Sequence, residues 1–214
     1  MLKKLIYFSP LGYFVSLVHN FLRKLHQPFM AYGYWNVSTN ELRRMTRISS
    51  TAVISDKKNI NIADNCWIWH HSILDGSNGI VIEEGVQIGA WVGIFTHSSH
   101  TAVRLHGKDY INVDRTQRIG YTRGLVKIGA YSFIGAGALI LPGVEIGKGC
   151  LIGAGAVVSK SVPEFSIVQG NPARVVGSTL SLDQAYFDDP VVQRHYFDPA
   201  TMEAYLAGKK TKTQ

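Results

Sequence analysis

Two histidines are the side chains of this chain best suited to acid–base chemistry: His97 and His100, in the run FTHSSHTAVR. An imidazole ordinarily titrates near pH 6.5, so it can accept a proton from a hydroxyl group at neutral pH. A hydroxyl is a poor nucleophile until a base takes that proton during its attack on a carbonyl carbon. A single loop histidine is more often solvated or structural, whereas two within four residues make one of them a candidate base.

These histidines open a segment, about Thr96 to Val126, that is dense in polar and ionisable side chains. It also contains Arg104, His106, Lys108, Tyr110, Arg115, Arg118, Tyr121 and Arg123. The segment interrupts a regular repeat, and repeat proteins place such insertions as loops on one face, often the binding face. We therefore expect substrate contacts here, with Arg104 and Tyr110 as candidates.

The repeat itself predicts the elements that position the histidines. Neither a helix, with a period near 3.6, nor a strand, with a period of 2, produces a strict period of six. A fixed hexad predicts an all-β solenoid, in which each short strand turns a corner and stacks on the coil before it. The aliphatic residues that carry this period are Ile128, Ile134, Ile140, Ile146, Ile152 and Val158.

Earlier hexads are less regular. They begin weakly at Ile48 and Ile54, strengthen from Ile62 to Leu74, and resume at Ile82 after a slip of two residues. We therefore predict a solenoid over residues 48–177, a basic amphipathic segment over 1–47, and a helical cap with a basic tail over 178–214. Asp198 and Pro199 are the predicted N-cap and first residue of a helix in that cap.

Both cysteines, Cys66 and Cys150, stand four residues after a hexad aliphatic, a position that points into the solenoid. There a free thiol behaves as a small hydrophobic group, and a disulfide between distant coils is geometrically unfavourable. This pattern favours reduced thiols in a cytoplasmic protein and argues against a cysteine nucleophile.

The net charge of +7 is concentrated at the N-terminus, since residues 1–47 hold seven Lys and Arg against one acidic residue. Such a segment indicates attraction to anionic lipid, an acidic acceptor or phosphates. Nucleic acid is not expected, because no nucleic-acid-binding motif accompanies the charge. From residue 11 the apolar positions define an amphipathic helix, too short and too polar to span a membrane, that either packs on the solenoid end or lies on a membrane surface.

The run IGAYSFIGAGALILPGVEIGKGCLIGAGAVVSKSVPEFSIVQGNPARVVG carries unbroken hexads followed by Gly170-Asn171-Pro172-Ala173-Arg174. It resembles the hexapeptide-repeat acyltransferases, and most of all the branch of maltose, galactoside and polysaccharide O-acetyltransferases. The resemblance implies a left-handed parallel β-helix with three hexads per coil, assembled as a homotrimer. The hand cannot be derived from the period, because parallel crossovers in sheets are overwhelmingly right-handed.

The resemblance also implies an acetyl-CoA-dependent O-acetyltransferase, without a metal, that acetylates a sugar hydroxyl. The long basic loop and the basic N-terminus favour a surface polysaccharide or its lipid-linked precursor as the acceptor, and the inward cysteines favour direct transfer. Relatives of the maltose type place the catalytic histidine five residues after the last aliphatic of the hexad, where this chain has Ser99. The base is therefore His97 or His100, and a one-residue shift favours His100.

By the same resemblance, acetyl-CoA lies in the groove between neighbouring prisms. Trp91, which stands at a different hexad position from the tryptophan of close relatives, is a third candidate acceptor contact beside Arg104 and Tyr110. Glycine and alanine would let the pantetheine arm approach the backbone, and the two cations would bind phosphates. The matching positions are Gly135, Ala136, Gly153, Ala154, Lys160, Asn171, Pro172 and Arg174.

Three alternatives remain open from the sequence. The first is N-acetylation of an amino sugar or xenobiotic with the same base and coenzyme. The second is a metal enzyme similar to the γ-type carbonic anhydrases, with His97, His100 and His106 as ligands, although the spacing does not reproduce that family's pattern. The third is a non-catalytic solenoid. We expect a cytoplasmic location, with attachment to the inner face of the membrane through the N-terminal helix as a further hypothesis.

Overall fold

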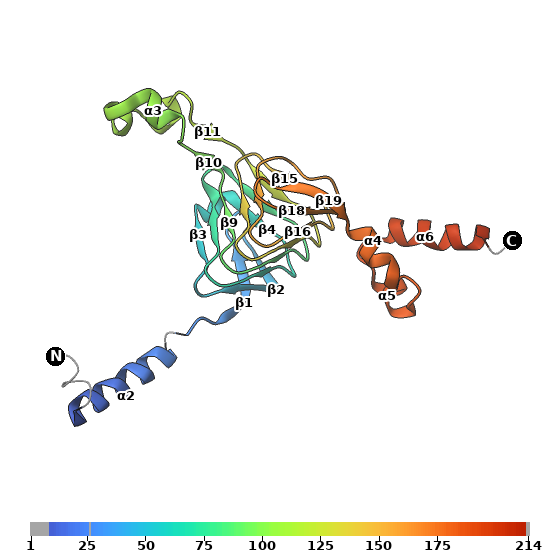
Figure 1. Cartoon of the computed structure of the whole chain (residues 1–214), viewed down its shortest axis with the longest axis horizontal. Helices are drawn as coiled ribbons and strands as arrows, with labels where there is room; N and C mark the ends of the chain where they lie inside the picture. Colours follow the sequence, from blue (N-terminus) through green and yellow to red (C-terminus); the bar gives the residue numbers. More distant parts are fainter. Residues whose placement is uncertain (1–8, 26, 213–214) are drawn as a thin grey trace.

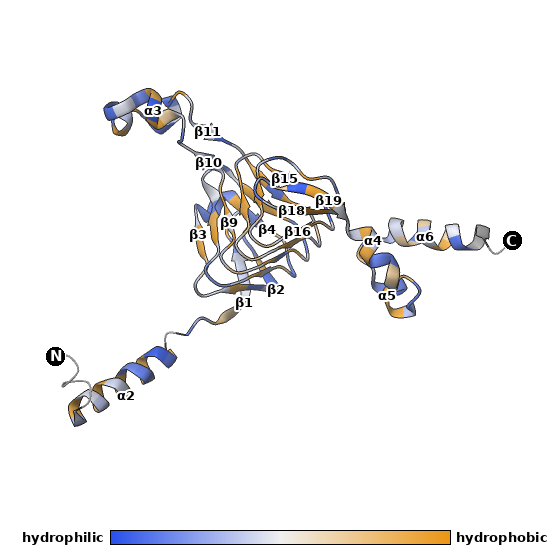
Figure 2. Ribbon diagram, in the orientation of Figure 1, coloured by the Kyte–Doolittle hydropathy of each residue, from blue (hydrophilic) through white to orange (hydrophobic). Residues whose placement is uncertain are grey.

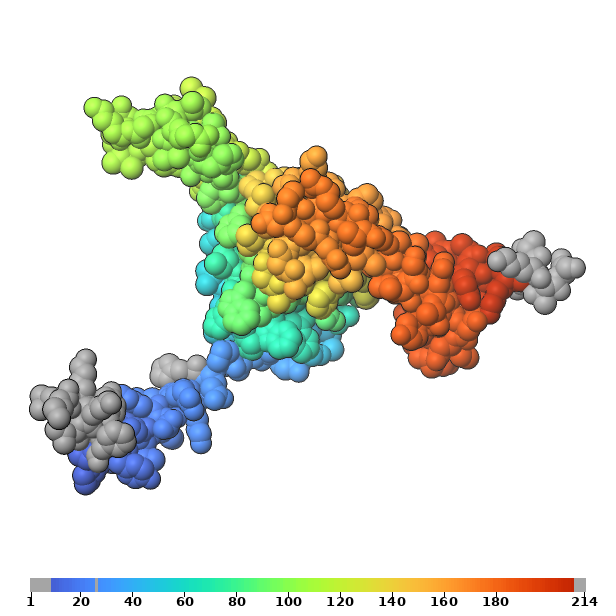
Figure 3. Space-filling view, in the orientation of Figure 1, coloured from blue at the N-terminus to red at the C-terminus, as the bar shows by residue number. Residues whose placement is uncertain are grey.

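A computed structural model describes residues 9–25 and 27–212. The centre of the molecule is a stack of short strands, and three segments project from it: the N-terminal helix, an excursion that carries α3, and the C-terminal helices (Figure 1). The space-filling view shows the same three projections around one solid body (Figure 3). The catalytic candidates therefore lie where one projection leaves a rigid core.

The core is a parallel β-helix with three faces, so the predicted solenoid is confirmed. Each coil contributes one strand to each face, and strands of successive coils pair in parallel. Face A contains β2 (Glu41–Ser49), β5 (Trp67–Ile68), β8 (Gln87–Ile88), β13 (Phe133–Ile134), β16 (Leu151–Ile152) and β18 (Ser166–Gln169). Face B contains β3 (Val53–Ser55), β6 (Ile73–Asp75), β9 (Gly93–Ile94), β14 (Leu139–Ile140) and β17 (Val157–Val158). Face C contains β4 (Ile60–Ile62), β7 (Ile80–Ile82), β12 (Val126–Ile128) and β15 (Glu145–Ile146).

The hexad aliphatics form the buried interior, in register from coil to coil. Ile68 pairs with Ile88, which pairs with Ile134 and then Ile152, and all four are buried. Identical side chains stack in columns because a parallel ladder aligns equivalent residues of each coil. Cys66 and Cys150 are also buried, as predicted, and both thiols are free.

The corner between faces B and C departs from the hexad. Between β3 and β4, and again between β6 and β7, the connection contains a short 3-10 turn: η1 (Lys57–Asn59) and η2 (Gly76–Asn78). The latter accounts for the two-residue slip in the sequence. One coil later the same corner opens into the excursion between β9 and β12, which holds β10 (His97–Ser98), α3 (Ala102–His106), η3 (Gly107–Ile111), η4 (Arg115–Gln117) and β11 (Thr122–Arg123). The insertions are thus stacked on one edge of the prism.

An antiparallel hairpin closes the first end of the solenoid: β1 (Met30–Asn36) pairs with β2, which in turn pairs with β5. The predicted boundary at residue 47 therefore falls inside β2, and the solenoid sheet includes residues assigned to the N-terminal segment. The reason is that β2 is polar along much of its length and shows little hexad pattern, yet its backbone completes the sheet.

Helix α2 (Pro10–Leu25) projects away from the body and does not pack on the solenoid end, so that alternative is wrong (Figure 1). Its apolar side chains are exposed; Phe14 and Phe21 are each 62% exposed. Figure 2 shows its polar and apolar colours side by side along the helix. No helix among the described residues is long and apolar enough to cross a bilayer.

The far end of the prism leads into helices, as predicted for the cap. Strand β19 (Arg174–Ser178) pairs with β18, and α4 (Thr179–Asp183), η5 (Gln184–Tyr186), α5 (Pro190–His195) and α6 (Pro199–Lys212) follow. Helix α6 begins at Pro199, and the carboxylate of Asp198 accepts a 2.6 Å hydrogen bond from the Thr201 hydroxyl. Lys148 reaches that carboxylate at 3.0 Å and so ties the cap to the solenoid.

Candidate active site

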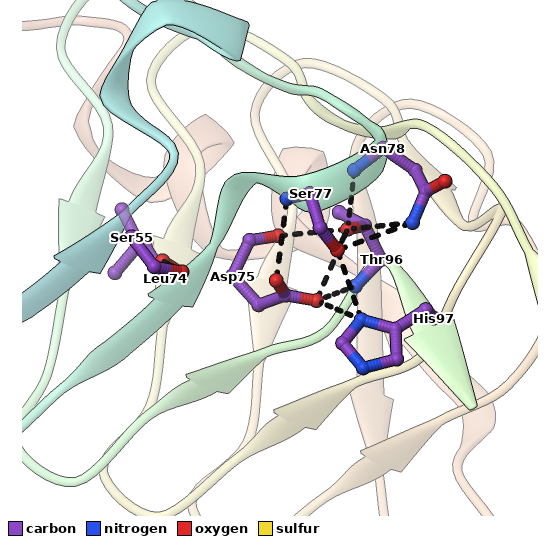
Figure 4. A network of polar contacts seen from close by, with 7 residues as sticks. All are labelled: Ser55, Leu74, Asp75, Ser77, Asn78, Thr96 and His97. Atoms are coloured by element: carbon purple, nitrogen blue, oxygen red, sulfur yellow. Dashed lines mark hydrogen bonds and ion pairs between the residues drawn. The ribbon is translucent and has the colours of Figure 1, made fainter. Parts of the chain in front are cut away.

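His97 is held by a carboxylate from the preceding coil. Its Nδ1 lies 2.6 Å from Oδ2 of Asp75 and 2.9 Å from Oγ of Ser77. Asp75 is the last residue of β6 and precedes His97 by 22 residues; Ser77 lies in η2 and precedes it by 20. In Figure 4 the imidazole turns Nδ1 toward this network and its other ring nitrogen away from it. Coil stacking has therefore built a His–Asp pair from distant parts of the sequence.

Thr96, the buried residue directly before His97, locks the backbone in place (Figure 4). Its amide donates to Asp75 Oδ2 at 3.1 Å, and its hydroxyl donates to the Asp75 carbonyl oxygen at 2.8 Å. The amide of Asn78 donates to the same hydroxyl at 2.9 Å. Because these bonds cross from one coil to the next, the rigid prism holds the backbone and the Nδ1 side of the imidazole in place.

The network also fixes the charge of Asp75. Burial works to raise the pKa of this carboxyl, but hydrogen bonds from Ser77 and Thr96 and the nearby His97 outweigh it and hold the pKa below its usual range. A carboxylate only accepts hydrogen bonds, so the contact at 2.6 Å assigns a proton to Nδ1 of His97. That tautomer leaves the lone pair on Nε2 free to take a proton from a substrate.

Both histidines line one cleft of about 340 Å³. The Nε2 atom of His97 has no hydrogen-bond partner among the described residues, and the side chain is 34% exposed. His100 is exposed, and its Nδ1 lies 2.7 Å from the hydroxyl of Ser98. Only His97 therefore has a carboxylate to orient it. The cleft is lined by Phe95, His97, Ser98, His100, Thr122, Leu141, Pro142 and Ser159.

A solenoid of this kind, with a histidine at the root of an excursion, is comparable with known proteins. A family model described as bacterial transferase hexapeptide (six repeats) matches residues 125–160. The solved structure of a hexapeptide-repeat containing acetyltransferase from Vibrio cholerae is 30% identical with a TM-score of 0.50, and the match covers 61% of this chain and 69% of that one.

The chain belongs to the hexapeptide-repeat transferases. Membership in this family implies a left-handed winding of the β-helix. A candidate acetyltransferase from Saccharomyces cerevisiae is 39% identical over 128 residues, which is 58% of this chain and 59% of the relative. Serine acetyltransferase 2 from Arabidopsis thaliana is 31% identical over 166 residues, which is 78% of this chain and 46% of the relative. The chain thus spans about half the length of the curated relatives it matches.

In this hexapeptide-repeat transferase, two of the predicted coenzyme residues lie close to the histidine cleft. Ser159, which lines the cleft, also lines a second pocket of about 250 Å³ that contains Lys160 and Arg174. Neither cation forms an ion pair with an acidic side chain of the described residues. Two unpaired cations beside a pocket suit the phosphates of a coenzyme.

The small residues predicted to contact the coenzyme lie on a different edge, between faces A and B. Gly135 and Gly153 follow β13 and β16 there, and the Asn171–Pro172 peptide, which is cis, follows β18. A Cβ on Gly135 would meet the backbone nitrogen of Ala154 at 2.6 Å. The close approach of successive coils therefore requires this glycine, whatever it binds, and a coenzyme role for Gly135, Ala136, Gly153 and Ala154 remains a prediction.

The predicted acceptor residues are also divided between two places. Arg104 and Tyr110 lie in the excursion, where Arg104 donates to the backbone oxygen of His100 at 2.5 Å. Trp91 lies on the edge between faces A and B, 65% exposed and stacked on His71 at 5.9 Å between ring centroids. Within one chain, the structure does not bring Trp91 together with His97.

Sequence reasoning missed Asp75, Ser77 and Thr96, which hold the histidine. A signal was present: the interval from Leu74 to Ile82 is two residues too long for a hexad, and the extra residues form η2. A turn at the same corner as the excursion could have been expected to stack beneath it.

The thiols are poorly suited to act as nucleophiles. Burial raises the pKa of Cys66 to about 11 and raises that of Cys150 as well. Since the thiolate is the nucleophile, both remain unreactive at neutral pH. Among the described residues, no three His, Cys, Asp or Glu side chains are grouped to hold a metal ion, so His97, His100 and His106 do not form the ligand set considered above.

Proposed function

We propose that this protein transfers an acetyl group from acetyl-CoA to a hydroxyl of a saccharide, with His97 as the general base. Family membership and the acetyltransferase names of its relatives support acetyl transfer. The observation that carries the choice of His97 is its 2.6 Å contact with Asp75. The preference for His100 drawn from the sequence is thereby reversed in the proposal, since of the two histidines only His97 has a carboxylate partner among the described residues.

In the proposed reaction, Nε2 of His97 takes the proton of the acceptor hydroxyl as its oxygen attacks the thioester carbonyl carbon. The new C–O bond forms, the C–S bond breaks, and the imidazolium returns its proton to the departing sulfur. The anionic Asp75 stabilises the imidazolium while it exists. Because Cys66 and Cys150 are buried thiols, transfer is direct and forms no acyl-enzyme.

For acetyl-CoA, we propose a path from the cleft to Lys160 and Arg174, whose side chains would pair with the phosphates. The cleft and the adjoining pocket meet at Ser159, which supports a continuous path. The small residues on the other edge, Gly135 and Ala136 among them, would then contact a coenzyme held by a second copy of the chain. This division of the predicted residues between two edges favours a site completed between copies.

We further propose that the copies form a homotrimer. The outward side chains of face B are apolar and uncovered: Val53 is 57% exposed, Ile73 43% and Leu139 36%. Face C instead carries Lys127, which lies 3.3 Å from Glu83 and Glu145. An exposed apolar face beside a charged one favours burial of face B against another copy. In the proposed trimer face B meets a different face of that copy, and a rotation of one third of a turn closes this head-to-tail contact into a ring. Light scattering would measure the trimer mass, and a monomer would contradict the proposal.

Helix α2 supports the hypothesis of a cytoplasmic enzyme attached to the inner face of a membrane. Its apolar side chains are exposed, its last turn carries Arg23 and Lys24, and the helix contains no acidic residue. Such a helix suits the surface of an anionic bilayer. We expect co-sedimentation with vesicles containing phosphatidylglycerol, and its loss in the Phe14→Glu/Phe21→Glu variant; equal sedimentation of that variant would contradict the hypothesis.

The proposed activity is tested by the release of free coenzyme A from acetyl-CoA in the presence of neutral, acidic and amino saccharides. We expect His97→Ala to lower kcat about 10²–10⁴-fold, the usual contribution of a general base, and His100→Ala to lower it less than tenfold. The reverse order would assign the base to His100. Transfer to amino sugars alone would support N-acetylation, and no transfer or acetyl-CoA binding at all would indicate a non-catalytic solenoid.

A further inference from the structure

The excursion gathers three arginines around one tyrosine. The guanidinium carbon of Arg123 lies 4.8 Å from the centroid of the Tyr121 ring, that of Arg115 5.5 Å, and that of Arg118 5.9 Å. Arg118 is held further by hydrogen bonds to the Val113 carbonyl oxygen and the Tyr110 hydroxyl, each at 3.1 Å. We call Arg115, Arg118 and Arg123 the arginine cluster. Because each side chain rests on Tyr121, the cluster is partly ordered before any ligand arrives.

The charge of the arginine cluster is not neutralised by ion pairs. None of its three guanidinium groups lies within ion-pairing distance of an acidic side chain in the described part of the chain. Asp114 accepts hydrogen bonds from the amide and hydroxyl of Thr116 at one carboxylate oxygen, and these bonds, with the charges of Arg118 and Arg123, lower its pKa. It forms no ion pair with the arginine cluster within the described residues. Three like charges close to one ring repel each other, so an incoming anion would relieve that repulsion.

The cluster is joined directly to the proposed base. The ring of Tyr121 stacks on the imidazole of His97, with centroids 5.6 Å apart and planes within 8°. Thr122, between Tyr121 and Arg123, lines the cleft that contains His97. Strand β11 continues this arrangement, because Arg123 pairs with His97 across the β10–β11 ladder. A group bound to the arginine cluster would therefore lie beside the histidine and at the mouth of the cleft.

We propose that the acceptor is an anionic saccharide, and that the arginine cluster binds its carboxylate or phosphate while a neighbouring hydroxyl reaches His97. This inference rests on the proposed function and adds the charge class of its acceptor. Guanidinium groups are suited to the task because their planar donors match both anions with paired hydrogen bonds. The anion and the reacting hydroxyl belong to one molecule, which explains why the cluster is attached to the base through a ring stack.

The phosphates of acetyl-CoA are the other source of anions at this site. In the proposed coenzyme path these phosphates bind Lys160 and Arg174, in the pocket that shares Ser159 with the cleft. The arginine cluster stands instead on the excursion, on the segment that ends at β11. Two groups of unpaired cations in different places favour two different anionic ligands, and the kinetic experiment below separates them.

The experiment compares matched acceptors: an oligogalacturonate and its methyl-esterified, neutral counterpart. Arg115→Gln removes one charge of the cluster and leaves in place the hydrogen bonds that Arg118 makes to Val113 and Tyr110. Arg123→Gln removes a second charge, together with the hydrogen bond that the Arg123 guanidinium donates to the Arg115 carbonyl oxygen. Each should lower kcat/KM for the uronate about tenfold to 100-fold, the range for a charge-assisted hydrogen bond, and leave the neutral acceptor within twofold. The control is Lys108→Gln, which removes an exposed excursion cation outside the cluster and should change neither value.

If either arginine variant lowers kcat/KM equally for the charged and the neutral acceptor, the inference is overturned. A rise in the KM for acetyl-CoA in these variants would also overturn it, because the cluster would then bind the coenzyme. Calorimetric titration of the wild-type protein with the oligogalacturonate, without acetyl-CoA, provides a readout independent of turnover. Binding that weakens in Arg115→Gln supports the site even if no acetyl transfer occurs, and in that case only the proposed function fails. If the oligogalacturonate does not bind and neutral saccharides are acetylated, the anionic acceptor is refuted and the proposed acetyl transfer stands.

Discussion

The substitution Asp75→Asn tests the central interaction of the site with little change in shape. The side chain keeps an oxygen that can still accept a hydrogen bond from the Thr96 amide, which is 3.1 Å away in the wild type. What it loses is the negative charge 2.6 Å from Nδ1 of His97. The Thr96 amide and Nδ1 of His97 both contact Oδ2 of Asp75, so the two orientations of the new amide differ in effect. With its oxygen at that position the amide still accepts from both groups. In the flipped orientation it loses the Thr96 bond and donates to Nδ1, which favours the tautomer with the proton on Nε2. The imidazole would then present a proton where the mechanism needs a lone pair.

The size of the effect follows from the charge lost in the transition state. An imidazolium and a carboxylate about 4 Å apart attract each other by about 4 kcal/mol at the effective dielectric constant near a protein surface. His97 is 34% exposed, so solvent screening reduces this figure, and about 3 kcal/mol remains. Since 1.36 kcal/mol corresponds to a factor of ten in rate, we expect kcat to fall roughly 100-fold, and further if the unproductive tautomer dominates.

The measurement is kcat for acetyl transfer from pH 5 to 8, together with the denaturation midpoint. The pKa of Asp75 lies below its usual range, so its contribution to stability is present above the unfolded value near 3.9 and is lost as the pH falls through the lower folded value. Asp75 is thus ionised throughout the assay. Titration of Asp75 should therefore cause no change in the ratio of wild-type to variant kcat between pH 5 and 8.

Asp64→Asn is the matched control. Asp64 also accepts a backbone hydrogen bond that joins two coils, from the amide of Met45 at 2.8 Å. It accepts a second, local one from the amide of Asn65 at 2.8 Å, and its pKa is likewise lowered. It lies on the corner between faces C and A and contacts no histidine. We expect a small loss of stability and wild-type kcat. If Asp75→Asn behaved like this control, the His97–Asp75 pair would be structural and the proposed mechanism refuted.

Three further perturbations test the solenoid. Burial raises the pKa of Cys66 to about 11, so the protonated thiol stabilises the fold fully below its unfolded pKa near 9. The free energy of unfolding, measured by urea titration, should fall by about 3 kcal/mol as the pH rises from 9 through 11, and Cys66→Ala should not show this fall. Ile140→Ala, in the buried column of face B, should lower the free energy of unfolding by about 2–5 kcal/mol; a loss under 1 kcal/mol would contradict the close packing. Gly76→Ala places a Cβ 2.7 Å from the Ser55 carbonyl oxygen, so we expect a lower melting temperature and a lower kcat, because η2 carries the residues that hold the base.

Much of the solenoid could be predicted from the sequence because its determinants are local and repeated. Each hexad places one aliphatic residue inward, and Ile134 and Ile152, for example, occupy the predicted column and pair in the predicted register. The helix beginning at Pro199 was predictable for the same reason, since a cap and a proline act within one turn. Strand β2 was not, because its polar side chains give little pattern and its place depends on pairing with β5.

The candidate site shows the same division. The sequence alone determined that histidines stand where the hexads stop, and it predicted acid–base chemistry there. Only the tertiary structure decided which histidine is oriented, because Asp75 and His97 are 22 residues apart and meet through the stacking of two coils whose corner insertions differ in length. It also decided that α2 stands away from the body and that three arginines surround Tyr121. Periodicity encodes which residues face inward, whereas the neighbours of an outward side chain depend on how far each corner departs from the period.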